Sequence, residues 1–370
     1  MLQKLTNFQG IQGPVVIIVM DGYGLPKTDV GSAIAAAKKP TLDRLFANYP
    51  NIRLRAHGTA VGMPSDDDMG NSEVGHNAIG AGQIYSQGAS LVADAIASGA
   101  IWQGEAWHQI IAGAKDGRSV IHFLGLFSDG NVHSHIDHLK AMVVQAKAEG
   151  IKTVRVHALL DGRDVPETSA LEYVIPFEAF LADVSTDGFD ARIASGGGRQ
   201  FITMDRYDAN WPMVEKGWKT HVLGQGTQFP NATAAVNGLR EQHPGTIDQD
   251  LPEFVIADNG KAIGTIEDGD SVVFFNFRGD RAIEITRAFE EANFDKFDRV
   301  RAPKVTYAGM LQYDGDLKLP ARFLVAPPAI KDTTGEWFSK SGIAQFACSE
   351  TQKFGHVTYF WNGNRSGKFE

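Results

Sequence analysis

The sequence of 370 residues has a single cysteine, no long apolar run near its start and no excess of basic residues. Cys348 cannot form a disulfide within the chain, which is typical of a reducing compartment, and we expect it to be a buried structural thiol. The early apolar run VVIIVM, residues 15–20, is far shorter than the roughly 20 residues of a membrane span and has no cleavage signal. We therefore expect a cytoplasmic protein without a membrane partner.

The charge balance restricts the class of partner. Acidic residues outnumber basic ones by 44 to 35, so the formal net charge is −9. A broad basic face for nucleic acid is not expected, because neutralisation of phosphates dominates such binding. An anionic small molecule can still bind where basic residues converge. With 43% hydrophobic residues the chain is predicted to be globular, and its length predicts two domains.

The order of apolar and turn-forming segments predicts an α/β fold. Residues 14–24 predict a buried parallel strand with Asp21 at its carboxyl end, where open α/β sheets place their ligands. Further strands are predicted at residues 119–130, 152–164 and 343–349 and at the start of 271–294, with helices at 38–50, 136–150 and the end of 271–294. Residues 119–164 thus predict a right-handed βαβ unit.

Two faint linkers, residues 83–89 and 319–328, predict that the middle of the chain is an insertion. The predicted domains are residues 1–87 together with 325–370, and residues 88–324.

The stretch MGNSEVGH, residues 69–76, leaves two roles open for Ser72. A serine in a glycine-rich turn before a helix is near backbone amides and the positive end of the helix dipole, which favour a bound phosphate. Its hydroxyl still needs a base or a metal for activation, and with no histidine triad evident, metal activation through Asp21 fits better. From the pattern alone, helix capping is the more common role.

Five arginines lie in turns rich in glycine and acidic residues. Arginine binds phosphate or carboxylate with two hydrogen bonds, and neighbouring glycines let a backbone approach the ligand closely. Each arginine alone is more often part of a surface ion pair, but together they would form a polyanion pocket. These residues are Arg163, Arg199, Arg206, Arg278 and Arg281.

Two further segments contain candidate ligand residues. HSHIDH, residues 133–138, matches no common zinc spacing, so a metal site is the least favoured of three alternatives, the others being a solvated helix start and a ligand-binding histidine, with His133 the best candidate. Lys353 follows the strand predicted at residues 343–349, where it either neutralises a phosphate or is a solvated loop residue.

Long motifs in these same regions resemble one known family. They are residues 20–24, 57–82, 128–139, 157–170, 193–207, 272–285 and 349–364. In sequence and order they are similar to the cofactor-independent (2,3-bisphosphoglycerate-independent) phosphoglycerate mutases, particularly the trypanosomatid and plant branch. The resemblance implies an alkaline-phosphatase-like metal domain, split in sequence by an inserted α/β phosphotransferase domain. It also implies an isomerase of glycolysis and gluconeogenesis that interconverts 3-phosphoglycerate and 2-phosphoglycerate through a phosphoserine.

The resemblance implies a role for each candidate residue. Ser72 resembles the nucleophile, Asp21 a ligand of the metal that binds the Ser72 oxygen, and Asp164 the acid and base. The residues that resemble substrate ligands are His133, Arg163, Arg199, Arg206, Arg278, Arg281 and Lys353, together with Asp164. Two divalent cations, Mn²⁺ or Mg²⁺ and in some cases Co²⁺, are expected in the complete enzyme, which we expect to be a monomer.

The chain departs from the family pattern in two places. Asn131 replaces a glycine, and we expect it to alter only a loop because asparagine tolerates positive φ. The motifs Asp-x-x-x-Gly-His and Asp-His-Gly-Asn, which supply most metal ligands in the family, do not occur. We therefore expect a partial metal domain with exposed apolar edges. The alternatives are a metal-dependent phosphohydrolase and an inactive fragment that only binds phosphoglycerate.

Overall fold

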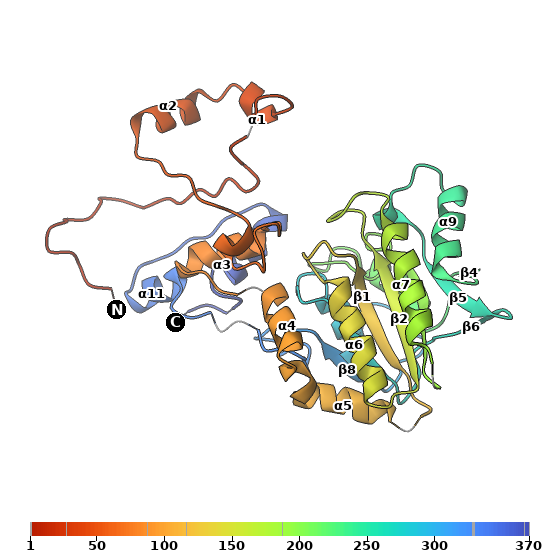
Figure 1. Cartoon of the computed structure of the whole chain (residues 1–370). Helices are drawn as coiled ribbons and strands as arrows, with labels where there is room; N and C mark the ends of the chain where they lie inside the picture. Colours follow the sequence, from red (N-terminus) through yellow and green to blue (C-terminus); the bar gives the residue numbers. More distant parts are fainter. Residues whose placement is uncertain are drawn as a thin grey trace.

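A computed structural model describes residues 2–26, 28–86, 88–115, 117–186, 188–327, 330–365 and 367–369. The described chain forms a large sheet domain beside a smaller, mainly helical part, and an extended N-terminal segment lies beyond the latter (Figure 1). The limits of the inserted domain, residues 88–324, stay a prediction. Gln87 and Pro328, which belong to the two predicted linkers, lie outside the described residues.

The sheet is mostly parallel, with strand order β4-β5-β3-β2-β1-β7-β8 and with β6 paired to β5. The β3–β5 and β5–β6 pairs are antiparallel, and the other strand pairs among the described residues are parallel. Every residue of β1 is buried, as expected for a parallel strand covered on both faces. The strands are β1 Ile121–Phe127, β2 Thr153–Leu160, β3 Asp190–Gly198, β4 Thr227–Phe229, β5 Phe254–Asp258, β6 Lys261–Ala262, β7 Ser271–Phe274 and β8 Thr306–Gly309.

Helices pack on this sheet and bury the main hydrophobic core. Figure 1 shows α6 (Ile136–Ala148) and α7 (Ala170–Val184) across one face. The others near the sheet are α4 Gly88–Ala97, α5 Glu105–Ala114, α8 Trp211–His221, α9 Ala232–Gln242 and α10 Ile283–Glu290. None of the helices in the described part of the chain is long and apolar enough to cross a membrane.

The central α/β predictions are confirmed. Strand β1, helix α6 and strand β2 follow the order predicted for residues 119–164, and β1 pairs with β2 in parallel. The helix ends at a glycine of positive φ, since Gly150 has φ 85°. Residues 271–294 form β7, a turn and α10, also as predicted.

The smaller part is built around α3 (Ser72–Ala81), which packs on the short π-helix η5 (His356–Phe360). Its remaining elements are α1 Ala33–Ala36, α2 Pro40–Asn48, α11 Thr334–Lys340 and the single 3₁₀ turns η1 Gly58–Val61 and η4 Thr351–Lys353. The helix predicted at residues 38–50 is thus confirmed as α2. Two more 3₁₀ turns, η2 Ala100–Gln103 and η3 Asp248–Asp250, lie in the sheet domain.

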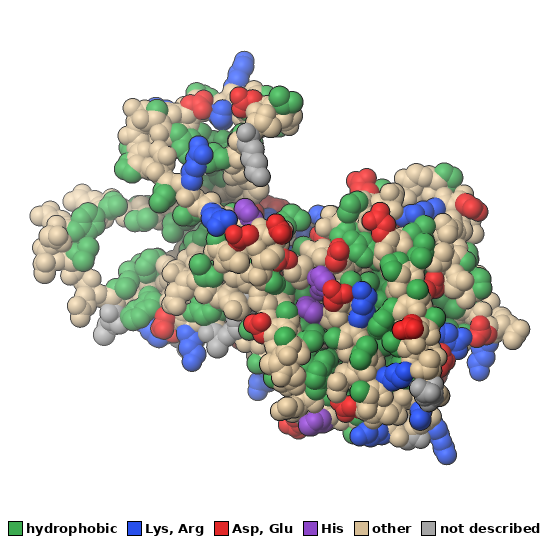
Figure 2. All heavy atoms as spheres, viewed as in Figure 1, with side chains coloured by type: hydrophobic (Ala, Val, Ile, Leu, Met, Phe, Trp, Pro, Cys, Tyr) green, Lys and Arg blue, Asp and Glu red, His purple; other side chains and the backbone are tan. Residues whose placement is uncertain are grey.

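The two strands predicted at residues 14–24 and 343–349 are wrong. Both segments are irregular, and residues 15–20 are exposed, with Ile18 at 79%. A strand needs a neighbouring backbone with which to form a ladder, and no strand of the described chain pairs with either segment. Apolar side chains of the N-terminal segment therefore lie at the surface (Figure 2). Cys348 is exposed for the same reason, so its predicted burial is also wrong.

Candidate active site

Ser72 is the first residue of α3, and it does not cap that helix. The cap is Asn71, whose side-chain oxygen accepts a hydrogen bond from the Val74 amide at 3.2 Å. The capping role, the more common one for such a serine, is therefore wrong here. The half-buried Ser72 hydroxyl is free to make other contacts.

Those contacts are with Asp21 and Lys353, which lie far away in the sequence. The Ser72 hydroxyl donates to the Asp21 carboxylate. Lys353 Nζ donates to Ser72 Oγ at 2.9 Å and forms an ion pair with Asp21 Oδ2 at 2.5 Å. Burial alone would raise the pKa of Asp21, but the hydrogen bonds from Lys353 and Ser72 outweigh it and hold the pKa below its usual value. The structure thus brings together a hydroxyl, a proton acceptor and a cation.

Four of the basic candidates gather around Asp280, an acid that sequence reasoning missed. Arg278 Nε lies 3.2 Å from Asp280 Oδ1, and Arg206 NH1 lies 3.3 Å from Oδ2. His133 Nδ1 is 3.7 Å from Oδ1. Burial opposes ionisation, but the charges of Arg278, Arg281 and Arg206 keep the pKa of Asp280 well below its ordinary range. The available signal was its place between two candidate arginines in NFRGDR.

Arg281 carries a positive charge that the nearby Asp280 carboxylate does not fully balance. Its side chain is buried and donates to the backbone oxygen of Met204 at 2.5 Å. Burial, together with the nearby charges of Arg206, Arg199 and Arg163, lowers the pKa of Arg281 to about 10. Such a position favours a bound anion, which would supply the missing negative charge.

Asp164 and Arg199 form a second ion-paired group. Arg199 NH1 contacts the Asp164 carboxylate and lies 2.9 Å from Asp161 Oδ1. Asp161 also accepts from the backbone amides of Arg163 and Asp164 at 3.1 Å, which fixes this turn. The Arg163 side chain is exposed, in contrast to the buried side chains of Arg199 and Arg281.

The histidine-rich segment behaves as a helix start. His135 caps α6, accepting from the Asp137 amide at 3.2 Å. His133 is buried, and burial followed by the charge of Arg199 keeps its pKa well below 6.5, so it is neutral near pH 7. No group of three or more His, Cys, Asp or Glu residues in the described chain could hold a metal ion, which gives no support to a zinc site here.

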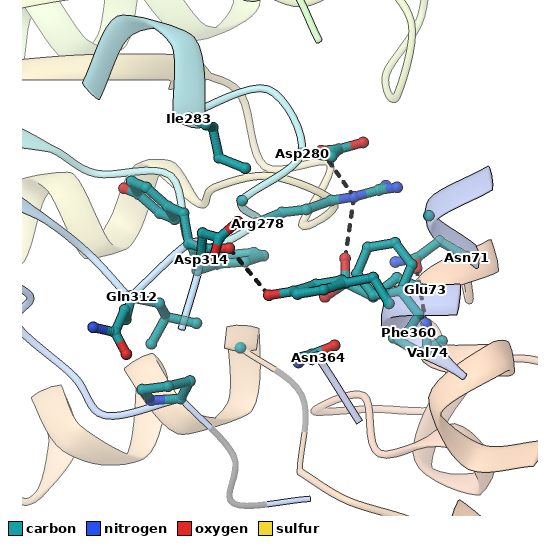
Figure 3. A pocket seen from close by; sticks show the side chains of 18 of the residues that line it. Asn71, Glu73, Val74, Arg278, Asp280, Ile283, Gln312, Asp314, Phe360 and Asn364 are labelled. Atoms are coloured by element: carbon teal, nitrogen blue, oxygen red, sulfur yellow. Dashed lines mark hydrogen bonds and ion pairs between the residues drawn. The ribbon is translucent and has the colours of Figure 1, made fainter. Parts of the chain in front are cut away.

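Several side-chain contacts join the Ser72 side to the arginine side. Arg278 Nε lies 3.2 Å from Glu73 Oε2, so Arg278 joins Glu73 to Asp280 (Figure 3). Arg206 donates to Gln352 at 2.5 Å, and Asn131 donates to Asp68 at 2.5 Å. A cavity of about 500 Å³ lies beside the Arg278 bridge.

Asn131 therefore does more than the sequence predicted. Its φ of 56° confirms that it takes the left-handed conformation expected at a glycine position. Its side chain also links the loop after β1 to the acidic run of residues 65–68, a contact that glycine could not make.

Comparison with known proteins identifies the family. The family model described as the BPG-independent PGAM N-terminus matches residues 92–315, more than half of the chain. The chain belongs to the 2,3-bisphosphoglycerate-independent phosphoglycerate mutase family. This confirms the resemblance seen in the motifs.

Relatives of this mutase family support the assignment over nearly the whole chain. A probable 2,3-bisphosphoglycerate-independent phosphoglycerate mutase of Leptospira interrogans is 61% identical over 96% of this chain and 65% of its own length. The Trypanosoma brucei mutase is 54% identical over 96% of this chain and 65% of its own length. The crystal structure of Leishmania mexicana phosphoglycerate mutase at low cobalt concentration matches with a TM-score of 0.92 and 53% identity, covering 95% of this chain and 64% of that chain.

The chain thus spans about 65% of the length of its first curated relatives. The family model and the mutase structure agree with the predicted fold class, an α/β domain inserted in an alkaline-phosphatase-like scaffold.

Proposed function

We propose that this chain carries the nucleophile and the substrate arginines of a phosphoglycerate mutase that interconverts 3-phosphoglycerate and 2-phosphoglycerate independently of 2,3-bisphosphoglycerate. One observation carries the proposal: the Ser72, Asp21 and Lys353 group lies on α3 and its neighbours, and Arg278 joins α3 to the arginines around Asp280. The names of the relatives agree with this activity.

Phosphoryl transfer to Ser72 is the first chemical step. The Ser72 oxygen attacks the phosphorus of 3-phosphoglycerate, and its proton passes to the Asp21 carboxylate that already accepts it. The bond from phosphorus to the C3 oxygen breaks, and this oxygen takes a proton from Asp164, which must therefore enter the cycle in its acid form, released from Arg199 and protonated from solvent. Lys353, 2.9 Å from Ser72 Oγ, offsets negative charge on the transferred group.

Return of the phosphate to C2 completes the isomerisation. The glycerate must turn while it stays bound, so that its C2 hydroxyl gives a proton to Asp164 and attacks the phosphoserine. The Ser72 oxygen then regains its proton from Asp21. Asp164 must loosen its pairing with Arg199 to act in this way, and a substrate carboxylate at Arg199 would replace it.

Substrate retention is assigned to the basic residues. We assign the phosphate to Arg278 and Arg281, and the glycerate carboxylate and hydroxyls to His133, Arg163, Arg199 and Arg206. The incompletely balanced charge of Arg281 supports this assignment. Retention of glycerate distinguishes a mutase from a phosphohydrolase, which needs no such residues.

Divalent cations, Mn²⁺, Mg²⁺ or Co²⁺, belong to the proposal as partners of the complete enzyme. Asp21 and Ser72 would contribute two oxygen ligands, of the kind that these cations bind. The described residues contain no cluster of three His, Cys, Asp or Glu ligands, so they do not form a whole metal site, and no step above passes through a metal. We also propose that the complete enzyme is a cytoplasmic monomer, and size-exclusion chromatography with light scattering tests its monomeric state.

A phosphoserine trap tests the proposed function. After incubation with 3-phosphoglycerate and Mn²⁺ and rapid acid quenching, we expect one phosphate on Ser72 by mass spectrometry. The Ser72→Ala variant should carry none, whereas Ser98→Ala, a matched change at an exposed serine, should be labelled like the parent. Phosphate on another residue, or release of inorganic phosphate faster than formation of 2-phosphoglycerate, would contradict the mutase.

A further inference from the structure

A chain of five hydrogen bonds crosses the core of the sheet domain and ends next to the arginine turn. His221 Nε2 lies 3.1 Å from Thr203 Oγ1, and His221 Nδ1 lies 2.8 Å from Ser195 Oγ. Ser195 Oγ is 2.7 Å from His157 Nδ1. His157 Nε2 is 2.9 Å from His122 Nδ1, and His122 Nε2 is 3.1 Å from Asp270 Oδ2. All six side chains are buried.

Proton counting gives this chain a single direction. Asp270 already accepts from the amides of Val120 and Glu267, so its carboxylate is the acceptor at one end. The three histidines are neutral, because burial lowers the pKa of each, that of His221 to about 3. Five protons are then available for five bonds, and each must point from Thr203 toward Asp270. This requires His221 to carry its proton on Nδ1, and His157 and His122 on Nε2.

Thr203 is held tightly at the other end of the chain. Its φ is 70°, a left-handed conformation that is costly for a β-branched residue and needs support from its surroundings. Helix α8 supplies that support, since a Cβ on Gly217 would lie only 2.1 Å from Thr203 Oγ1. His221 lies four residues further along the same helix, on the same face, and bonds the Thr203 hydroxyl. The Thr203 amide also donates to the Met213 oxygen at 2.9 Å.

The support reaches the substrate arginines through the backbone. Thr203 lies between Arg199 and Arg206, and the next residue, Met204, binds Arg281 through its backbone oxygen. A shift of Thr203 would therefore move the groups around the proposed phosphate and glycerate sites together. Sub-ångström placement of such groups decides how well they act.

We propose that Thr203 and His221 are positioning residues, and that the one-way hydrogen-bond chain to Asp270 fixes the turn of residues 199–206 in the geometry that binds phosphoglycerate. That the turn binds phosphoglycerate rests on the proposed function. That the hydrogen-bond chain fixes the turn does not depend on it.

Histidine tautomers test the direction of the chain. In the protein labelled with ¹⁵N-histidine, long-range ¹H–¹⁵N spectra should show His221 as the Nδ1–H form and His157 and His122 as Nε2–H forms, with assignments from single variants. A His221 that carries its proton on Nε2 would overturn the proposed chain, whatever the protein binds.

Hydrogen exchange tests whether the chain fixes the turn. Thr203→Val keeps the shape of the side chain but leaves His221 Nε2 without a donor, so amides of residues 199–206 should exchange at least about tenfold faster. Thr203→Ser keeps the hydroxyl and should restore slow exchange. Thr220→Val is the matched control, because Thr220 is also buried on α8 but its hydroxyl donates to the Lys216 oxygen of its own helix and stands outside the five-bond chain.

Calorimetric titration with 3-phosphoglycerate then tests the link to binding. The dissociation constant should rise about tenfold in Thr203→Val and stay near the parent value in Thr203→Ser and Thr220→Val. Equal affinity in Thr203→Val and the parent would overturn the positioning role. If the parent itself did not bind 3-phosphoglycerate, the proposed function would fail, while exchange and tautomer data would still decide the role of the chain in the turn.

Discussion

Asp280 shows how one acidic residue makes a cluster of arginines compatible with a folded core. Arg278 and Arg206 approach its two oxygens from different turns, and His133 lies beside them. Without this acid, the buried positive charges would repel one another in a medium of low dielectric constant. One anion inside the cluster leaves the net charge positive, which suits an anionic substrate.

Replacing Asp280 should therefore be costly. We expect Asp280→Asn to lower the free energy of unfolding by about 3 kcal/mol, because it removes the enclosed carboxylate that Arg278 and Arg206 share. Denaturant unfolding measures this change. Asp258→Asn is the matched control, since Asp258 pairs with Arg192 at the surface, and it should change stability by less than about 1 kcal/mol. Inorganic phosphate should stabilise Asp280→Asn more than the parent, and equal stabilisation would argue against an anion site here.

Glu284 should make stability depend on pH. Burial, and then the neighbouring Asp205 carboxylate, raise the pKa of Glu284 from 4.5 to about 8. The folded protein then holds a proton on Glu284 that the unfolded chain releases. The contribution of this proton to the free energy of unfolding is complete below pH 4.5 and is lost as the pH rises through about 8. Glu284→Gln keeps a donor toward Asp205 without this titration.

We expect Glu284→Gln to melt about 3 °C above the parent at pH 8 and near it at pH 5, as measured by calorimetry. The exposed Glu241→Gln should leave the difference between the two pH values unchanged. The change in melting temperature from pH 5 to pH 8 should therefore differ between the parent and Glu284→Gln. If the two proteins showed the same change, Glu284 would be ionised in the folded protein.

At the scale of elements, local patterns predicted the central sheet well and the terminal segments poorly. Strand β1, helix α6 and strand β2 carry strong periodic signals and find their partners within the sheet domain. Residues 15–20 carry an equally strong strand signal but have no neighbouring backbone in the described chain. A strand depends on a partner that its own residues do not encode, whereas a helix such as α2 satisfies its own backbone.

The site shows the same division. Long motifs pointed to Ser72, Asp21 and Lys353, and the structure brings these three together. Asp280 and Glu73 were missed, because an acid is recognised as a functional residue only when its distant partners are known. Similarly, nothing local shows that Asn71, and not Ser72, caps α3.

The contact between α3 and η5 sets the position of Ser72, and a glycine makes it possible. A Cβ on Gly80 would lie 2.1 Å from the backbone oxygen of Trp361, so Gly80→Ala should push α3 away from the segment that carries Lys353. We expect a melting temperature lower by several degrees and loss of phosphate labelling at Ser72.

Gly75→Ala provides the matched control on the same helix, since a Cβ there meets no atom within 4 Å. Alanine favours a helix over glycine by up to about 1 kcal/mol, so this variant should be as stable as the parent or slightly more stable. Normal labelling in Gly80→Ala would mean that Ser72 does not depend on this packing.

For the whole molecule, the described structure has two levels of burial, which predict two levels of local stability. The sheet domain contains nearly all of the hydrophobic core, whereas residues 2–55 bury almost no side chain. Yet Asp21 lies in this exposed segment, tied to the rest of the site by its contacts with Ser72 and Lys353. The proton acceptor of the proposed reaction is thus the least firmly supported member of the site.

Limited proteolysis should reveal this difference. Chymotrypsin should cut first within residues 2–55, where Phe8, Phe46 and Tyr49 are 57%, 48% and 56% exposed, and at least about tenfold faster than within the sheet domain. Mass spectrometry identifies the cuts. First cuts within β1 to β8 would contradict the structure. Because cleavage after Phe46 separates Asp21 from the chain that carries Ser72, loss of phosphate labelling should follow that cut, whereas the hydrogen exchange of residues 199–206 should not change.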